Sequence, residues 1–176
     1  MFDFLRAIIS FFEGNKIAYM LSGSVAMSTY VLPRFTRDID FIVHLKSADA
    51  LLLSNHFSDG YYCDEESIRD AISRKGMFNI IDHKSFYKAD FVILKDDPYQ
   101  RTEFGRRRLV DLLDMKIWVV APEDLLLSKL IWIQHLQSAQ QAEDIKLLAE
   151  IKDLDWNYIR NWVKELKLNT FGIISA

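Results

Sequence analysis

The sequence is poor in cysteine, proline and glycine, and each shortage removes a class of protein. Its 176 residues include one cysteine, Cys63, so the chain cannot close an internal disulfide and has no thiolate cluster for structural zinc. With only three prolines and six glycines, the chain contains no proline- and glycine-rich linker, and it shows no repeat or low-complexity tract. This cysteine usage is typical of a reducing compartment, and we expect a cytoplasmic location.

Long hydrophobic runs and a strong excess of one charge are also missing. No apolar run reaches the roughly 18 residues that span a bilayer, and the first residues lack the basic region and cleavage pattern of a signal peptide. We therefore expect neither secretion nor a membrane partner. The formal net charge is -3 and the pI is about 5.8, so binding to nucleic acid would require a local basic patch. Arg106, Arg107 and Arg108 form the only such cluster, which we interpret as a solvated turn ahead of an apolar strand.

What the chain does contain is enough apolar sequence for one compact core. Half of the residues are apolar and 13% are aromatic, and the four tryptophans are expected to fill the core rather than to stack on bases. Apolar periodicity and turn signals predict an α/β (α+β) fold, with a mixed β-sheet flanked by helices and a C-terminal helical region. We place a soft boundary near residue 120, between an α/β core over 1–120 and a helical subdomain over 121–176 that packs on it.

The predicted elements alternate between short strands and helices. Strands are expected at about 17–21, 38–45, 77–82, 88–94 and 117–120. Helices are expected at about 3–13, 24–32, 48–56, 65–74, 123–137, 140–151 and 155–167.

The most informative motif is a small-residue turn followed by two carboxylates. Gly23 and Ser24 follow an apolar strand, and Asp38 and Asp40 begin another strand downstream. Residues at i and i+2 of a strand point to the same face about 6.6 Å apart, so both carboxylates can converge on a divalent cation, while Ile39 points into the core. Gly23 lets the main chain approach phosphates closely, and Ser24 adds a hydroxyl. The pattern predicts metal-dependent phosphoryl or nucleotidyl transfer.

Asp90 is the candidate third carboxylate. It lies between Ala89 and Phe91 in an apolar strand, and pairing of the predicted strands would place it in the same sheet as Asp38 and Asp40. There it can bridge a second metal ion or take the proton from an attacking hydroxyl. Plainer alternatives remain open at this point. Asp38 can pair with Arg34 or Arg37, Asp90 can pair with a buried basic group, and Gly23 and Ser24 can form an ordinary turn and helix cap.

At these residues the chain resembles the DNA polymerase β-like nucleotidyltransferase superfamily. The shared pattern is Leu21-Ser22-Gly23-Ser24, then Asp38-Ile39-Asp40, then a later strand aspartate at Asp90. The form Thr36-Arg37-Asp38-Ile39-Asp40 resembles the AbiEii toxin-like branch in particular. The segment from Ala121 to Leu130, which carries Lys129, resembles a further motif of that branch, and Glu143-Asp144-Ile145 matches the last one loosely. The departure is Gln140-Gln141-Ala142, where the branch usually has arginine or lysine.

The resemblance implies a reaction and a set of residues. Asp38, Asp40 and Asp90 would bind Mg²⁺ or Mn²⁺, Gly23 and Ser24 would hold phosphate, Lys129 would contact the nucleotide phosphates and Asp144 would orient the nucleotide. Arg34 and Arg37 flank the catalytic strand and are candidates to clamp a triphosphate, although Lys129 can equally be a snorkelling surface lysine and Asp144 a helix-start acid.

The substrate would be a nucleoside triphosphate, and the acceptor a hydroxyl of tRNA, protein or a small molecule. A related pattern in kanamycin-type aminoglycoside nucleotidyltransferases keeps the small molecule open, and the toxin-like branch implies a possible cognate antitoxin. The alternative is a catalytically inactive nucleotide- or partner-binding module of the same fold.

Overall fold

The computed structural model of the protein describes residues 1–33, 35–112, 114–135 and 138–174. Helices occupy the following ranges: α1 Phe2–Gly14, α2 Gly23–Met27, α3 Ser47–His56, α4 Glu65–Arg74, α5 Pro98–Gly105, α6 Pro122–His135, α7 Ala139–Ala149 and α8 Trp156–Glu165. Strands occupy these: β1 Ala18–Ser22, β2 Asp38–His44, β3 Tyr61–Tyr62, β4 Met77–Asp82, β5 Lys88–Ile93, β6 Arg108–Leu112 and β7 Met115–Val119.

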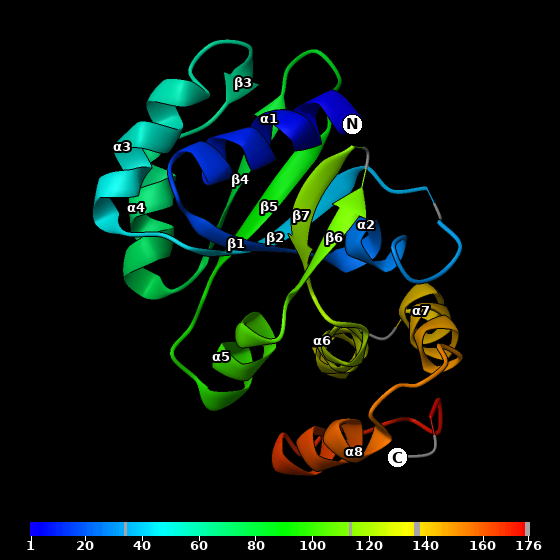
Figure 1. The fold of residues 1–176 in the computed structure, drawn as a ribbon. Helices are drawn as coiled ribbons and strands as arrows, with labels where there is room; N and C mark the ends of the chain where they lie inside the picture. The colour runs from blue at the N-terminus through cyan, green and yellow to red at the C-terminus, as the bar shows by residue number, and fades with distance from the viewer. Residues whose placement is uncertain (34, 113, 136–137, 175–176) are drawn as a thin grey trace.

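Within the described residues, the strands form one mixed sheet (Figure 1). Its order is β3-β4-β5-β2-β1-β7-β6. The pairs β2–β5 and β1–β7 are parallel, and the other neighbouring pairs are antiparallel. The centre of the sheet is therefore β2, which carries the two motif carboxylates and lies between β5 and β1. This mixed sheet flanked by helices confirms the predicted fold class.

Alternation along β2 and β5 separates an apolar face from a polar one. Ile39, Phe41 and Val43 are buried, whereas the residues between them are less so, and β5 repeats the pattern with buried Phe91. On the apolar face, Phe12 of α1 makes edge contacts with both Phe41 and Phe91. Because α1 covers this face, the residues of β2 and β5 that point the other way are left for the site.

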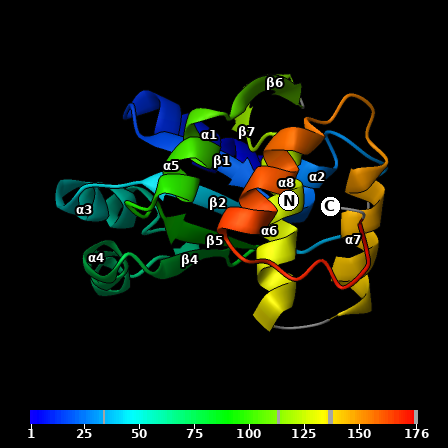
Figure 2. The same cartoon turned by 90° about the horizontal axis from the view of Figure 1, so that it is seen from below.

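The helices after β7 gather with α5 at the end of the molecule remote from α1 (Figures 1 and 2). The central one is α6, whose leucines and also Lys129 are buried. A helix that is apolar on all sides needs neighbours on all sides, and α6 contacts α2, α7 and α8. Of the helices that the structure describes, none has the length and apolar character to cross a bilayer.

Most predicted elements are confirmed, with bounds that differ by a few residues. The helix predicted over 24–32 is shorter, because α2 ends at Met27 and the Ser28 and Thr29 hydroxyls bond to the carbonyls of Val25 and Ala26 in the following turns. The short β3 and the helix α5 were not predicted as elements, whereas β6 is the apolar strand expected after the arginine cluster. Trp132 is 60% exposed, so the expectation that all tryptophans fill the core is wrong for this one.

The arginine cluster is not a solvated turn. Arg106 follows α5 and forms ion pairs with Asp124 at 2.9 Å and Glu123 at 3.1 Å, while its guanidinium lies over the Tyr158 ring. Arg107 packs between the Phe104 and Trp118 rings. The interpretation fails because the acids at the start of α6, which favour the positive end of the helix dipole, also pair with Arg106 and Arg108.

Candidate active site

Antiparallel pairing of β1 with β2 brings the small-residue turn against the first carboxylates. Ser22 is the register partner of Asp40, so Gly23 lies directly beside the Asp40 side chain. Gly23 has φ +62°, and a Cβ built on it would lie 2.6 Å from Asp40 Cγ. Neither the backbone conformation nor the space admits a side chain at this position. The turn and the carboxylate are thus one packed unit.

The three aspartates lie on one face of two neighbouring strands. Parallel pairing of β2 and β5 places Asp40 opposite Asp90, and Asp38 opposite Lys88. Lys88 Nζ lies 2.7 Å from Asp90 Oδ2 and 3.7 Å from Asp38 Oδ1. The hydrogen bond from Lys88 to Asp90 raises the pKa of the lysine. Asp90 therefore pairs with a basic group, although Lys88 is 37% exposed and not the buried group that the alternative named.

The donor set matches a divalent ion only in part. Carboxylate oxygens suit Mg²⁺, which proteins commonly hold through one or two carboxylates together with substrate phosphates, and Asp38 and Asp40 meet that description. Within the described part of the chain, however, no three His, Cys, Asp or Glu side chains are grouped so that they could hold a metal ion. Asp90 Oδ2 is already paired with Lys88, and the metal role of the three aspartates stays a prediction.

The surroundings of Asp40 disfavour the negative charge of its carboxylate. Burial raises the pKa of its carboxyl, the neighbouring Asp90 raises it further, and the Lys129 ammonium opposes both. Asp90 Oδ1 is buried without a hydrogen-bond partner among the described residues. Desolvated, closely spaced carboxylates are costly unless a cation or a proton compensates them, so this part of the sheet favours positive charge.

Lys129 and Asp144 meet across α6 and α7. Lys129 Nζ lies 2.7 Å from Asp144 Oδ2, and both side chains are almost fully buried. Gln140 donates a hydrogen bond from Nε2 to Asp144 Oδ1 at 3.1 Å. The glutamine that departs from the related pattern is thus a neutral partner of the same aspartate. Lys129 is not a snorkelling surface lysine, and Asp144 does more than favour a helix start.

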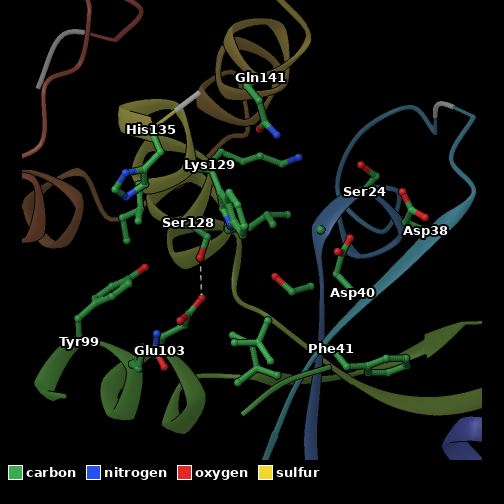
Figure 3. A pocket seen from close by; sticks show the side chains of 18 of the residues that line it. Ser24, Asp38, Asp40, Phe41, Tyr99, Glu103, Ser128, Lys129, His135 and Gln141 are labelled. Atoms are coloured by element: carbon green, nitrogen blue, oxygen red, sulfur yellow. Dashed lines mark hydrogen bonds between the residues drawn. The ribbon is translucent and has the colours of Figure 1, made fainter. Parts of the chain in front are cut away.

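One cavity lies between the Gly23–Ser24 turn, the carboxylates of β2 and Lys129 of α6. It has a volume of about 620 Å³ and reaches from β2 to α5 and α6. Figure 3 shows Ser24, Asp38 and Asp40 on one side, with Lys129 and Gln141 extending from the helices toward them. Gly23 also lines the cavity. Phosphate-binding and metal-binding candidates from three separate elements, α2, β2 and α6, therefore face one space.

The far end of the cavity carries a carboxyl that sequence reasoning did not single out. Glu103 of α5 is 2% exposed, and its Oε1 accepts a hydrogen bond from the Ser128 hydroxyl at 2.7 Å (Figure 3). Burial raises the pKa of Glu103 to about 8, and the nearby Asp124 adds to this effect. Glu103 is therefore mostly protonated at neutral pH. Tyr99 and His135 line the same end.

Not every predicted site residue lines the cavity. Arg37 is exposed, and its guanidinium lies 5.9 Å from the Phe35 ring centroid. Arg34 falls outside the described residues. Asp90 borders the site through Asp40 but is not among the cavity-lining residues, and the same holds for Asp144 behind Lys129. The structure thus brings Gly23, Ser24, Asp38, Asp40 and Lys129 to one cavity and places the others around it.

One missed residue, Lys88, and one missed helix, α5, had signals in the sequence. Lys88 precedes Asp90 by two positions and therefore had to share its face of the strand. Asp97-Pro98 is a helix start signal, with a capping acid followed by proline, and Asp97 does cap α5 by accepting a hydrogen bond from the Gln100 amide. Nothing local marks Glu103 or Gln141, since only the packing of α5 and α7 brings them to the cavity.

Comparison with known proteins places the fold. No protein-family model matches the sequence, and no curated protein matches it either. Solved structures do match. The lincosamide antibiotic adenylyltransferase LnuA, in its lincomycin-bound form, has a TM-score of 0.57 at 17% identity, covering 84% of this chain and 95% of that one.

Two further structures give the same result. ANT(2'')-Ia in complex with adenylyl-2''-tobramycin has a TM-score of 0.57 at 9% identity, covering 94% of this chain and 95% of that one. An antigenic nucleotidyltransferase-like protein from Paracoccidioides brasiliensis has a TM-score of 0.56 at 14% identity, covering 91% and 84%. At these identities the likeness is one of fold, and the chain has the fold of nucleotidyltransferases.

Proposed function

We propose that this protein is a divalent-metal-dependent nucleotidyltransferase that moves a nucleoside monophosphate from a nucleoside triphosphate to a hydroxyl of a small molecule. The observation that carries the proposal is the single cavity in which Asp38 and Asp40 face Lys129 across the Gly23–Ser24 turn. The nucleotidyltransferase fold supports it. Nucleotidyl transfer needs positive charge on a triphosphate and fixed positions for two reactants, and these residues supply both.

The reaction is a displacement at the α-phosphorus. The acceptor oxygen forms a bond to that phosphorus, the bond from the phosphorus to the oxygen bridging to the β-phosphate breaks, and pyrophosphate leaves. Asp38 and Asp40 are the proposed ligands of Mg²⁺ or Mn²⁺, which neutralises phosphate charge when bound. Gly23, Ser24 and Lys129 are proposed to bind the phosphates.

The remaining site residues take supporting roles in this proposal. Asp90 is the proposed acceptor of the hydroxyl proton, since its Oδ1 has no hydrogen-bond partner within the described residues. Asp144 is proposed to hold Lys129 in place through their ion pair, and through it the nucleotide. Arg37 stays a candidate for a triphosphate contact from the loop before β2.

The far end of the cavity favours a small acceptor. Glu103, Tyr99, Ser128 and His135 line this end of the cavity, and the exposed Trp132 lines the cavity as well. A cavity of about 620 Å³ is within the usual range of small-molecule sites. The acceptors in the similar structures are antibiotics, lincomycin in one and tobramycin in the other. We therefore rank a small molecule above tRNA or protein as the acceptor.

A second candidate is a nucleotide-binding module without turnover, such as one half of an AbiEii-like toxin and antitoxin pair. Two observations favour it. Asp90 is held by Lys88, and Lys129 is held by Asp144, so two proposed catalytic side chains are engaged within the protein. The pairing of Lys129 with Asp144 also agrees with the motifs on which the AbiEii resemblance rests.

A label-transfer screen tests the proposal. Each of the four α-³²P-labelled nucleoside triphosphates is incubated with Mg²⁺ and with tobramycin, lincomycin, tRNA or the protein alone. We expect label on a small molecule, abolished by EDTA and reduced at least about 10³-fold in the Asp38→Asn/Asp40→Asn variant. The matched control is Asp96→Asn/Asp111→Asn, which removes two carboxylates that are at least 75% exposed.

The outcomes separate the two candidates. Label transfer that survives the Asp38→Asn/Asp40→Asn change refutes the assigned site. If no acceptor is labelled, a thermal melt with Mg²⁺ and nucleotide decides. A nucleotide at 100 times its Kd stabilises the folded state by about 2.7 kcal/mol, so a raised melting temperature without transfer supports the binding module.

A further inference from the structure

The three-aspartate face already contains a cation that belongs to the chain. Lys88 begins β5, two residues before Asp90 and opposite Asp38 in the parallel pair. Its ammonium lies 2.7 Å from Asp90 Oδ2 and 3.7 Å from Asp38 Oδ1. Lys88 thus bridges carboxylates from two neighbouring strands. Its ammonium lies where a cation shared by both carboxylates would bind.

The position of Lys88 follows from strand geometry. Side chains two residues apart on a strand share a face, so Lys88 and Asp90 must lie side by side. Their side chains are 37% and 13% exposed, so the pair is shielded from solvent more than a surface ion pair. Three carboxylates on one face repel one another unless positive charge lies among them. One ammonium compensates one of the three charges permanently, because it is attached to the sheet.

We propose that Lys88 is the resident cation of this site, which takes the place between Asp38 and Asp90 that a second divalent ion would otherwise occupy. Asp38 and Asp40 are then left to hold a single divalent ion together with the triphosphate. The inference rests on the proposed function for the role of that ion, but it concerns how many ions the protein binds. It makes Lys88 a positioning residue that holds Asp90 in the plane of the site.

Two features of the structure support a single ion. The described residues contain no group of three metal-ligating side chains, although three aspartates share the face. Asp90 Oδ2 is already bound by the ammonium, and Asp90 Oδ1 is buried, with no hydrogen-bond partner among the residues described. A divalent ion at Asp90 would have to displace Lys88 from its 2.7 Å contact, whereas an ion at Asp38 and Asp40 would meet only the longer 3.7 Å contact from Lys88 to Asp38.

Counting bound Mn²⁺ tests the inference. The full chain is titrated with MnCl₂, and free Mn²⁺ is measured by electron paramagnetic resonance. We expect one ion per chain for the wild type and two for Lys88→Met, with Lys88→Gln as a second variant in case the first does not fold. Lys88→Arg keeps the charge and is expected to bind one ion. The matched control, Lys84→Met, removes an exposed lysine from the turn after β4 and is expected to bind one.

The numbers of Mn²⁺ ions bound by the wild type and by the variants decide the inference. Two ions on the wild-type protein, or an unchanged count in both Lys88→Met and Lys88→Gln, overturns the inference, and so does the absence of bound Mn²⁺ from all variants. Adding Asp90→Asn to Lys88→Met is expected to return the count to one, because Asp90 is a ligand of the second place alone. Failure of the proposed function looks different, because a wild-type protein with one bound ion and no label transfer contradicts only the transferase proposal.

Discussion

Gly23 shows how a single missing side chain shapes the site. The sequence predicts that this glycine lets the backbone approach phosphates. The structure adds a second reason, because the space beside its Cα is filled by the Asp40 carboxylate. A left-handed φ of +62° excludes most other residues on conformational grounds alone. The glycine and the aspartate are therefore required together.

Substitution of Gly23 by alanine is expected to cost both stability and activity. Strain at positive φ costs about 1–2 kcal/mol, and displacing Asp40 adds about 1–3 kcal/mol, as overpacking does elsewhere. Urea denaturation measures the sum. Gly60→Ala is the matched control, because Gly60 has φ +79° but a Cβ there meets no described atom within 4 Å. Equal losses for the two variants would show that Asp40 does not press on Gly23.

At the scale of elements, an ionic cluster ties α5 and α8 to the start of α6. Arg106 follows α5 and pairs with Glu123 and Asp124, and the Tyr158 hydroxyl of α8 donates a hydrogen bond to Asp124 Oδ1 at 2.5 Å. Glu123 and Asp124 are both buried, and burial raises the pKa of Asp124. This cluster holds α5, and with it Glu103, against the cavity.

Arg106→Ala is expected to destabilise the protein by about 3 kcal/mol, because it removes the cation paired with the buried Asp124 and leaves Glu123 with the longer contact from Arg108 at 3.5 Å. The exposed pair of Arg101 with Asp96, also on α5, provides the control, and Arg101→Ala is expected to cost less than about 1 kcal/mol. Chemical denaturation monitored by circular dichroism measures both. A loss for Arg106→Ala as small as that for Arg101→Ala would mean that the cluster contributes no stability.

Prediction of elements succeeded where the signals were local. The helix over Glu65–Arg74 was predicted to the residue, because its capping acid, its acidic first turn and the break before Gly76 all lie within the segment. The strands of the site were also predicted, since their alternation is strong. The helix predicted over 24–32 ends early, at Met27, where side chains compete for the backbone carbonyls, and α5 was not predicted although Asp97-Pro98 is a helix start signal.

At the scale of the whole molecule, buried carboxyls make stability depend on pH. Burial raises the pKa values of Asp40, Glu103 and Asp124, and that of Glu103 reaches about 8 from an ordinary value of 4.5. A raised native pKa means that the native state keeps a proton that the unfolded chain releases. The stabilisation is complete below pH 4.5 and is lost as the pH rises through 8.

The free energy of unfolding is therefore expected to fall between pH 5 and pH 8. One retained proton contributes a slope of at most about 1.4 kcal/mol per pH unit. Glu103→Gln removes this titration and is expected to flatten the curve, whereas Glu143→Gln, at an exposed position, leaves it unchanged. Urea melts at intervals of pH give the measurement. Parallel curves for Glu103→Gln and the wild type would contradict the assignment.

The sequence by itself determined the strands, the shared face of Asp38 and Asp40, and the turn at Gly23, because period-2 alternation and turn chemistry act over a few residues. It also indicated the fold class. Only the tertiary structure decided what the site residues touch. Lys88 meets Asp90, Lys129 meets Asp144, and Glu103 reaches the cavity. These contacts depend on how distant strands and helices pack, and no local pattern encodes that arrangement.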